Sequence, residues 1–234
     1  MVRSCSGLLR SQSATLFEQA VRVHREGGQC PENIYGGRQT FQLEPQLVDT
    51  NLPQYMMLQP DLEAEIKNHK FPGDPKDRIR MVQAVNSDYI NSGYDKGHLN
   101  PCADHPPGEG QTATFTFTNV APMALSLNRV AWRINEMNVR NIAPQCKIMY
   151  VITGVIPGDD WIIVKKQKRI NIPSYIWSAF CCLDNNDKPF KAQGFMAKNE
   201  NNLKVNPHSI SDLQSILVAQ YKIQNIILFQ NNCK

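Results

Sequence analysis

The pattern of hydrophobic and polar positions is clearest in the second half of the chain. Apolar residues gather there in short runs separated by turn signals, which is typical of strands. The predicted strands are residues 147–154, 161–173, 174–183 and 190–197. A helix is predicted over 208–222, where Ser211 and Gln214 stand at the spacing of a capping box.

The middle of the chain predicts further strands and then a helix. Short apolar runs at 81–85 and 88–90 indicate strands, and TATFTFTNV at 112–120 alternates Thr with Ala or Phe, a clear period of two. Helical spacing begins after Pro122, and Pro144 ends that helix. The apolar positions of this helix are Leu127, Val130, Ala131 and Ile134.

The first third of the chain is less regular. A short helix is expected around 14–23 and helical turns at 61–70, with Gly, Pro and polar residues between them. We therefore divide the chain into a loop-rich segment, 1–45, and one domain, 46–234. The mixture of strands and helices predicts an α+β domain, with a central, mostly antiparallel sheet flanked by helices.

Composition narrows the class of protein. The net charge of +4, from 25 basic and 21 acidic residues, permits an anionic partner without requiring one. No apolar run approaches the ~20 residues of a membrane-spanning helix, so no membrane contact is expected. The N-terminus also has no apolar stretch of the ~7–15 residues that a signal peptide needs, which indicates an intracellular protein or a chain without its leader.

The sequence contains 7 cysteines, and none forms a C-x-x-C pair, which argues against a zinc ribbon or a thioredoxin-type site. This number leans towards an oxidising compartment, and buried free thiols are the alternative interpretation. Cys102 lies close to His98 in the sequence, so an activated thiol is one possibility there. A structural disulfide, with Cys146 as the candidate partner, is the preferred interpretation.

The stretch YDKGHLNP, residues 94–101, is unusual for a purely structural element. Gly97 weakens a strand, and His98 is a side chain that can exchange a proton near neutral pH. Asn119 closes the next predicted strand, and the helix follows it. A strand–strand–helix unit can bring polar residues from all three elements into one small volume.

Asn128, Trp132 and Glu136 stand at i, i+4 and i+8, so they share one face of the predicted helix. Amide and carboxylate oxygens suit a hard cation such as Mg²⁺, which often takes only one or two direct protein ligands. A neutral imidazole near such an ion can take a proton from water. This combination is typical of phosphodiester hydrolysis.

These motifs resemble the DNA/RNA non-specific endonucleases, the ββα-metal (His-Me finger) group that includes endonuclease G, and most closely the endonuclease-domain-containing 1 type. YDKGHLNP, TFTFTNVAP and SLNRVAWRINEMN carry the resemblance, in that order. It is strong over the core motif, 88–141, extends towards the C-terminus and is poor before residue 80. It implies a ββα-metal element and hydrolysis of both DNA and RNA.

The resemblance also implies a role for each matched residue. His98 falls on the general base, Asn128 on the direct metal ligand and Glu136 on the carboxylate that holds metal-bound waters. Asn119 falls on a site-supporting asparagine, and Asp95 on the acidic residue that opens the histidine motif. The implied cofactor is Mg²⁺, with Mn²⁺ or another divalent cation as alternatives. An ordinary histidine pKa of ~6.5 would make activity fall below about pH 6.

Lys96 departs from the family pattern, which usually has arginine at this catalytic, substrate-contacting position. A lysine offers a point charge where arginine offers a planar fork, so a lower rate is expected. Arg129 and Arg133 are candidates for further contacts to phosphate. For a second family arginine, upstream of the histidine, Arg78 and Arg80 are the candidates.

Several alternatives stay open at this stage. The basic run KKQKR, 165–169, is interpreted as an edge strand whose lysines prevent aggregation, with contact to nucleic acid as the alternative. Trp132 is expected in the core rather than stacked on a base. A nucleic-acid-binding or interaction protein that has lost catalysis, and a hydrolase that uses Cys102 with His98, are the rival functions. The family resemblance allows a homodimer and favours secretion, with mitochondria or cytoplasm as alternatives.

Overall fold

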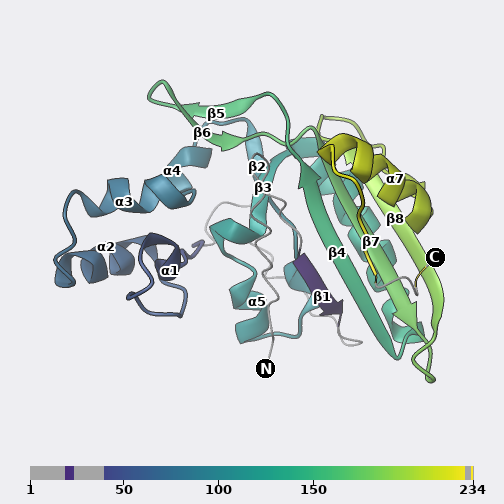
Figure 1. The fold of residues 1–234 in the computed structure, drawn as a ribbon. Helices are drawn as coiled ribbons and strands as arrows, with labels where there is room; N and C mark the ends of the chain where they lie inside the picture. Colours follow the sequence, from purple (N-terminus) through teal and green to yellow (C-terminus); the bar gives the residue numbers. More distant parts are fainter. Residues whose placement is uncertain (1–18, 24–39, 230–232, 234) are drawn as a thin grey trace.

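A five-stranded sheet dominates one half of the molecule in the computed structural model, which describes residues 19–23, 40–229 and 233 (Figure 1). All neighbouring strands of this sheet are antiparallel. In spatial order the strands are β1 (Gln19–Val23), β4 (Ile148–Ile156), β7 (Tyr175–Leu183), β8 (Pro189–Lys198) and β9 (Asn206–His208). The predicted α+β class and the antiparallel sheet are therefore confirmed.

Helices cover both faces of this sheet. On one face, α7 (Ile210–Tyr221) packs its buried leucines against Trp177 of β7. On the other face, the helix that follows residue 126 packs Trp132 against Ile176. Strand β7 is buried along almost its whole length because it faces apolar layers on both sides.

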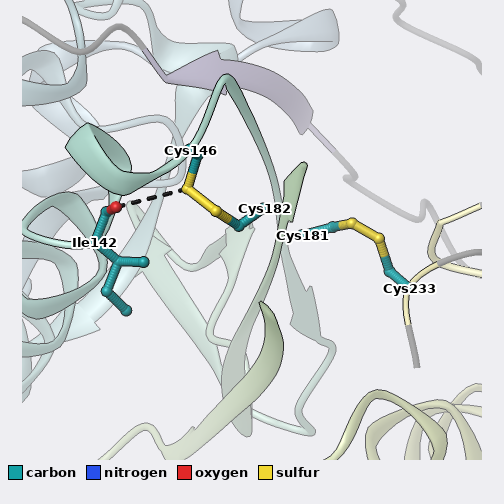
Figure 2. Close-up of a disulfide and its surroundings, with 5 residues drawn as sticks. All are labelled: Ile142, Cys146, Cys181, Cys182 and Cys233. Atoms are coloured by element: carbon teal, nitrogen blue, oxygen red, sulfur yellow. Dashed lines mark hydrogen bonds between the residues drawn. A yellow bond between two sulfur atoms is a disulfide. The ribbon is translucent and has the colours of Figure 1, made fainter. Parts of the chain in front are cut away.

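Neighbouring cysteines in β7 are disulfide-bonded on opposite faces of the sheet (Figure 2). Successive side chains of a strand point in opposite directions, so Cys181 and Cys182 cannot share one partner layer. Cys182 pairs with Cys146, which precedes β4, and Cys181 pairs with Cys233 near the C-terminus. The expected pairing of Cys102 with Cys146 is therefore wrong, although Cys102 is itself disulfide-bonded.

The other half of the described chain is built from short helices around an aromatic and aliphatic cluster that includes Phe41, Phe115 and Phe117. These helices are α1 (Pro45–Val48), α2 (Gln59–Asn68), α3 (Pro75–Val82) and α4 (Asn86–Tyr89). The helix expected at 61–70 is confirmed by α2. The strands expected at 81–85 and 88–90 are wrong, because these residues form the end of α3, a turn and α4.

A buried ion-pair cluster joins this helical half to a hairpin. Asp88 of α4 is fully buried and accepts hydrogen bonds from Arg169 at 3.1 and 3.2 Å. Arg80 of α3 lies 2.8 Å from the same carboxylate, and the backbone amide of Val85 also donates to it. Four donors, from α3, from β6 and from the turn before α4, therefore converge on one buried acidic side chain.

The segment 161–173 forms a hairpin rather than the single strand that was expected. Strands β5 (Trp161–Val164) and β6 (Gln167–Asn171) are antiparallel and form a sheet of their own. Lys165 and Lys166 turn the chain between them with φ angles of 50° and 67°. Positive φ at both central residues matches the right-handed twist of a two-residue hairpin turn, which a continuous strand does not need.

The strand–strand–helix unit lies between the two halves. Strand β2 (Tyr94–His98) pairs with β3 (Val120–Ala124), and the helix follows as a π-helical segment, η4 (Leu127–Trp132), and an α-helical one, α6 (Arg133–Arg140). Asn199 attaches β3 to the large sheet, because its amide donates to Pro122 O and Pro173 O, both at 2.9 Å. The ββα order predicted from the sequence is confirmed.

The connection between β2 and β3 differs from the prediction. Residues 112–120 are not one strand: they contain the end of α5 (Glu109–Ala113), the 3₁₀ turn η3 (Phe117–Asn119) and the first residue of β3. Thr114 and Thr116 are buried together with the phenylalanines, and the Thr114 hydroxyl donates to Gln111 O. The Thr/Phe alternation therefore does not separate a buried face from an exposed one. Two further short turns are η2 (Cys102–Asp104) and η5 (Ala143–Gln145).

Both ends of the described chain refine the predicted elements. The helix over 208–222 is confirmed by α7, but its N-terminal cap is Ser209, whose hydroxyl accepts from Asp212 N, instead of Ser211. The helix expected around 14–23 is wrong from residue 19 onward, where β1 begins, and residues 14–18 lie outside the described residues. Among the described residues, no helix is both long and apolar enough to cross a membrane.

Candidate active site

Strand β2 presents the residues of the DKGH motif alternately to two sides. Asp95 and Gly97 face the η4 helix and β3, where Asp95 is bonded to Asn128 and a Cβ on Gly97 would lie 2.7 Å from Met123 Cβ. Lys96 and His98 face the aromatic cluster of the helical half. The glycine is thus required by the close approach of Met123. The two charged residues before it, Asp95 and Lys96, face opposite sides of the strand.

The first group of the site consists of Asp95, Asn128 and Arg129. Asn128 Nδ2 donates to Asp95 Oδ2 at 3.0 Å, while Arg129 donates through Nε and Nη2 to both carboxylate oxygens at 2.8 Å. A carboxylate can only accept, so the nitrogen of the Asn128 amide must face Asp95 and its oxygen must face away. Asp95 therefore orients the amide oxygen of a half-buried side chain at the start of the helix.

The second group contains His98, whose ring lies between two phenylalanines. Its centroid is 4.9 Å from the edge-on ring of Phe115 and 5.7 Å from the ring of Phe41. His98 Nε2 is buried and has no hydrogen-bond partner within the described part of the chain. Burial lowers the pKa of His98 to about 4, and the positive charge of Lys96 acts in the same direction. The imidazole is therefore neutral at physiological pH.

Lys96 is held beside His98 by two interactions. Its ammonium donates to Asn86 Oδ1 at 2.8 Å and lies 4.3 Å from the centroid of the Phe41 ring, a cation–π geometry. Burial lowers the pKa of Lys96 below its usual range. The positive charge expected at the family's arginine position is therefore present on Lys96, but it already interacts with the Asn86 amide and the Phe41 ring.

Asn119 is buried and uses its whole side chain to hold the loop after His98. Its Nδ2 donates to Asn100 O at 3.0 Å and to Thr114 O at 2.8 Å, and its Oδ1 accepts from Asn100 N at 3.0 Å. All of these partners are backbone atoms. The geometry is that of a positioning residue, which fixes the course of the chain on both sides of the β2–β3 connection.

The third group surrounds Glu136 of α6. Burial raises the pKa of Glu136 to about 8, and the negative charge of Asp104 adds to this rise. The positive charges of Arg140 and Arg133 and a hydrogen bond from Trp132 oppose the rise. Burial also raises the pKa of Asp104, although Arg140 Nε donates to Asp104 Oδ1 at 2.9 Å.

A small cavity of about 20 Å³ adjoins Glu136 and has room for one water molecule. Its lining is mixed: Asp104, Thr153 and Ser178 are polar, whereas Val139 and Val151 are apolar. Trp132 is buried in the core and lines the same cavity, as its expected packing role requires. The helix face inferred from the sequence thus carries the half-buried amide of Asn128 at one end and the Glu136 carboxylate, beside this cavity, at the other.

The structure brings some of the predicted residues together and leaves others apart. Asp95, Asn128 and Arg129 touch one another, and Lys96 lies next to His98. The described contacts do not join His98 to Asn128 or to Glu136, because the side chains leave β2 and the helix in different directions. Arg133 is exposed on the helix and acts on Glu136 through its charge.

The structure also accounts for the remaining sequence candidates. Arg80 is committed to the buried Asp88 cluster, and Arg78 donates to Pro72 O while lying 5.0 Å from the centroid of Phe71. Cys102 is in a disulfide, which removes the activated thiol and with it the cysteine-hydrolase alternative.

Sequence reasoning missed Phe41, Asn86, Asp104 and Arg140. Their positions in the sequence do not indicate a role, because they come near the motif residues only when the chain is folded.

The donor set around the helix fits a hard divalent cation. Asn128 presents an oriented amide oxygen, and Glu136 is a half-buried carboxylate whose charged form a nearby cation would favour. No cluster of three or more His, Cys, Asp and Glu side chains suited to a metal occurs among residues 40–229. An ion here would therefore be bound by few protein atoms, as is usual for Mg²⁺.

The ββα unit on an antiparallel sheet, with a histidine, an oriented asparagine and a carboxylate on it, defines an α+β nuclease fold. The chain belongs to the DNA/RNA non-specific endonuclease family, whose model matches residues 54–231. The boundaries 1–45 and 46–234 drawn from the sequence stay a prediction.

Two relatives are similar to this chain in sequence, and one solved structure is similar to it in fold. The human endonuclease domain-containing 1 protein is 30% identical over 203 residues, covering 85% of this chain. Human mitochondrial endonuclease G is 38% identical over 73 residues, or 31% of this chain. The crystal structure of the EndoG/EndoGI complex contains a similar fold, with a TM-score of 0.58 at 15% identity, covering 89% of this chain and 77% of the other.

The chain spans only part of its curated relatives, 36% of the human endonuclease domain-containing 1 protein and 25% of human endonuclease G.

Proposed function

We propose that this chain is a Mg²⁺-dependent, sugar-non-specific endonuclease that hydrolyses phosphodiester bonds of DNA and RNA, with His98 as the general base. The observation that carries the proposal is the state of His98. Its Nε2 is buried without a hydrogen-bond partner in the described chain, and its low pKa keeps it unprotonated at neutral pH. A neutral imidazole nitrogen that no protein donor occupies can accept a proton from water.

Asn128 and Glu136 are the residues that would hold the divalent cation, Asn128 through its amide oxygen and Glu136 through bound waters. When bound, such an ion supplies positive charge that stabilises the developing negative charge on the phosphate and leaving group. Asp95 fixes the Asn128 amide, and Arg129 in turn fixes Asp95. Mn²⁺ or another divalent cation can take the same oxygen ligands.

The chain's own residues define the rest of the mechanism. The attacking water must reach His98 Nε2 past Phe41 and Phe115, which line the imidazole. His98 then removes its proton. Lys96 supplies positive charge beside the base and would exchange its bond to Asn86 for one to a phosphate oxygen. Because Asp95 and His98 lie on opposite sides of β2, the phosphate must lie across the end of this strand.

Removing the metal is the direct test of this function. Incubation of supercoiled plasmid and of a structured RNA with the protein is expected to give nicking that a chelator abolishes and that added Mg²⁺ restores. Gel electrophoresis measures both. Retarded migration without cleavage at any divalent metal concentration would contradict the proposal and favour the binding protein of the same fold.

The pH profile should be flatter than an ordinary histidine predicts. Because the pKa of His98 is lowered to about 4, the base stays deprotonated from pH 8 down to about pH 5. The rate should then fall as the pH passes through 4. Single-turnover cleavage at saturating Mg²⁺ measures this profile, and a fall centred near pH 6.5 would contradict the buried environment of His98.

The location that fits the chemistry best is an oxidising compartment. Disulfides at 146–182 and 181–233, together with the bonded Cys102, would be reduced in most cytosols. We therefore propose that the protein is secreted, and the mitochondrial location of the endonuclease G relatives is the alternative. Mass spectrometry of the protein from its native source, with free thiols blocked, tests this choice. The homodimer stays a prediction.

A further inference from the structure

The β5–β6 hairpin has an inner face fixed to the protein and an outer face left in solvent. Ile162 is buried in the cluster that also contains Phe41, and Ile170 packs against the same cluster. The neighbouring side chains point outward: Trp161 is 37% exposed and Ile163 is 55% exposed. In Figure 1 the hairpin lies along the upper edge of the molecule, above α4 and β2.

The base of the hairpin is held firmly. Arg169 of β6 is ion-paired with the buried Asp88, and it also donates to the backbone oxygen of Arg80. At the other end of β6, the Asn171 amide donates to Gly158 O at 2.7 Å and to Asp160 O at 3.1 Å. The outer face is therefore presented in one fixed orientation.

The tip of the hairpin keeps two lysines where the backbone favours other residues. Lys165 and Lys166 both have left-handed φ angles, 50° and 67°. A two-residue turn of this kind favours Asn-Gly, because positive φ brings the Cβ of other residues close to the backbone. Lysine is unfavourable at both positions of the turn, so we infer that these two side chains have a role other than forming the turn.

Positive charge is concentrated at this tip. Lys165, Lys166 and Lys168 are exposed, and none of them forms an ion pair within the described part of the chain. Lys168 stands opposite Ile163 and holds its ammonium 5.8 Å from the Trp161 ring. The nearest acidic residues in the sequence, Asp159 and Asp160, precede the opposite end of the hairpin.

We propose that this hairpin is a second nucleic-acid contact, in which Lys165, Lys166 and Lys168 bind backbone phosphates of a strand that extends beyond the cleavage site. The inference rests on the proposed function, because a polymeric polyanion is the partner whose charge complements the tip. The fixed base and the fixed turn mean that little ordering of the backbone is needed for binding. The lysines of 165–169 then contact nucleic acid, while β6 is also an edge of its two-stranded sheet, as the sequence predicted.

A pair of matched double variants tests the finger. K165N/K166G removes both tip charges and gives the turn the residues it favours, so the thermal midpoint should stay equal or rise. The control K70N/K222G removes two lysines that also have left-handed φ, 56° and 55°, at other places in the fold. Both variants change net charge and backbone propensity in the same way, so any difference between them reports on position.

Binding to a fluorescent 30-base-pair DNA is measured by anisotropy in EDTA, where no metal-dependent cleavage occurs. The slope of log K against log salt should fall by about 0.9 for each tip lysine that contacts a phosphate. We expect K165N/K166G to show this loss and K70N/K222G to keep the native slope. Equal losses in both variants, or a loss in neither, would overturn the proposal.

Trp161 provides an independent readout, because Trp132 and Trp177 are 2% and 0% exposed. DNA should protect Trp161 fluorescence from acrylamide quenching in the native protein and in the control, but much less in K165N/K166G.

Vesicles containing phosphatidylserine form the second arm of the experiment. Vesicle protection that depends on the tip lysines, without DNA protection, would assign the hairpin to an anionic lipid surface and overturn the proposal. Absence of chelator-sensitive nicking, with DNA binding retained, would sink the proposed hydrolysis but not the finger.

Discussion

Replacing His98 with alanine is expected to lower the single-turnover rate of DNA cleavage by roughly 10²- to 10⁴-fold, the usual contribution of a general base. The variant loses the neutral Nε2 that accepts the proton of the attacking water, while Asn128 and Glu136 remain to bind metal. The substitution should therefore affect the cleavage rate at saturating Mg²⁺ but not the affinity for Mg²⁺. The rate should fall while the metal concentration needed for half-maximal cleavage changes little.

The matched control is H208A, which removes a histidine from β9. It should cleave at the native rate. Because the His98 ring packs against Phe41 and Phe115, H98N is a second test variant that keeps a polar side chain of intermediate size. Cleavage by a folded H98A or H98N at a rate close to native would remove His98 from the mechanism.

Replacing Asp88 with alanine is expected to lower the free energy of unfolding by about 3–5 kcal/mol, because it leaves buried positive charges without their partner. The Asp88 carboxylate is fully buried, and the side chains of Arg80 and Arg169 that bind it are only 24% and 14% exposed. For a chain of this size, the loss corresponds to a thermal midpoint roughly 6–20 °C lower. Urea unfolding followed by circular dichroism, with the disulfides intact, measures it.

K147A is the control for this prediction. Lys147 pairs with Asp187 at 2.9 Å, but their side chains are 40% and 61% exposed. A pair so open to water contributes at most about 1 kcal/mol. Equal effects of D88A and K147A would show that the Asp88 cluster does not hold the hairpin and the helical half together.

Elements with simple apolar patterns could be predicted from the sequence. Strands at 148–156 and 175–183 follow from largely apolar runs, because a strand covered on both faces needs no alternation. The strand at 189–198 was predicted from its few apolar positions, although it contains polar residues and is only partly buried. The ββα order could be predicted too, since the motif residues occur in sequence in the order of its elements. The helix face was only partly right: Leu127 and Ala131 are buried, whereas Val130 and Ile134 are 42% and 47% exposed.

Long-range contacts explain why the rest could not be predicted. The Thr/Phe run has the period of a strand, yet Phe115 and Thr116 are both buried because the loop is covered from several directions. Asp88 and Arg169 are 81 residues apart, and Asp104 and Arg140 are 36 apart. These pairs determine the shape of the hairpin base and the charge around Glu136, and no local pattern indicates either.

The two disulfides that start from β7 would hold the C-terminal half together after a cut in its backbone. The crosslinks span 36 and 52 residues, and they start from adjacent residues of one strand. A protease that cut the exposed turn after β7, or the loop after β8, would leave both fragments covalently joined through Cys181 and Cys233. A nicked molecule would therefore keep both fragments and its assembled sheet until a reductant separated the pieces.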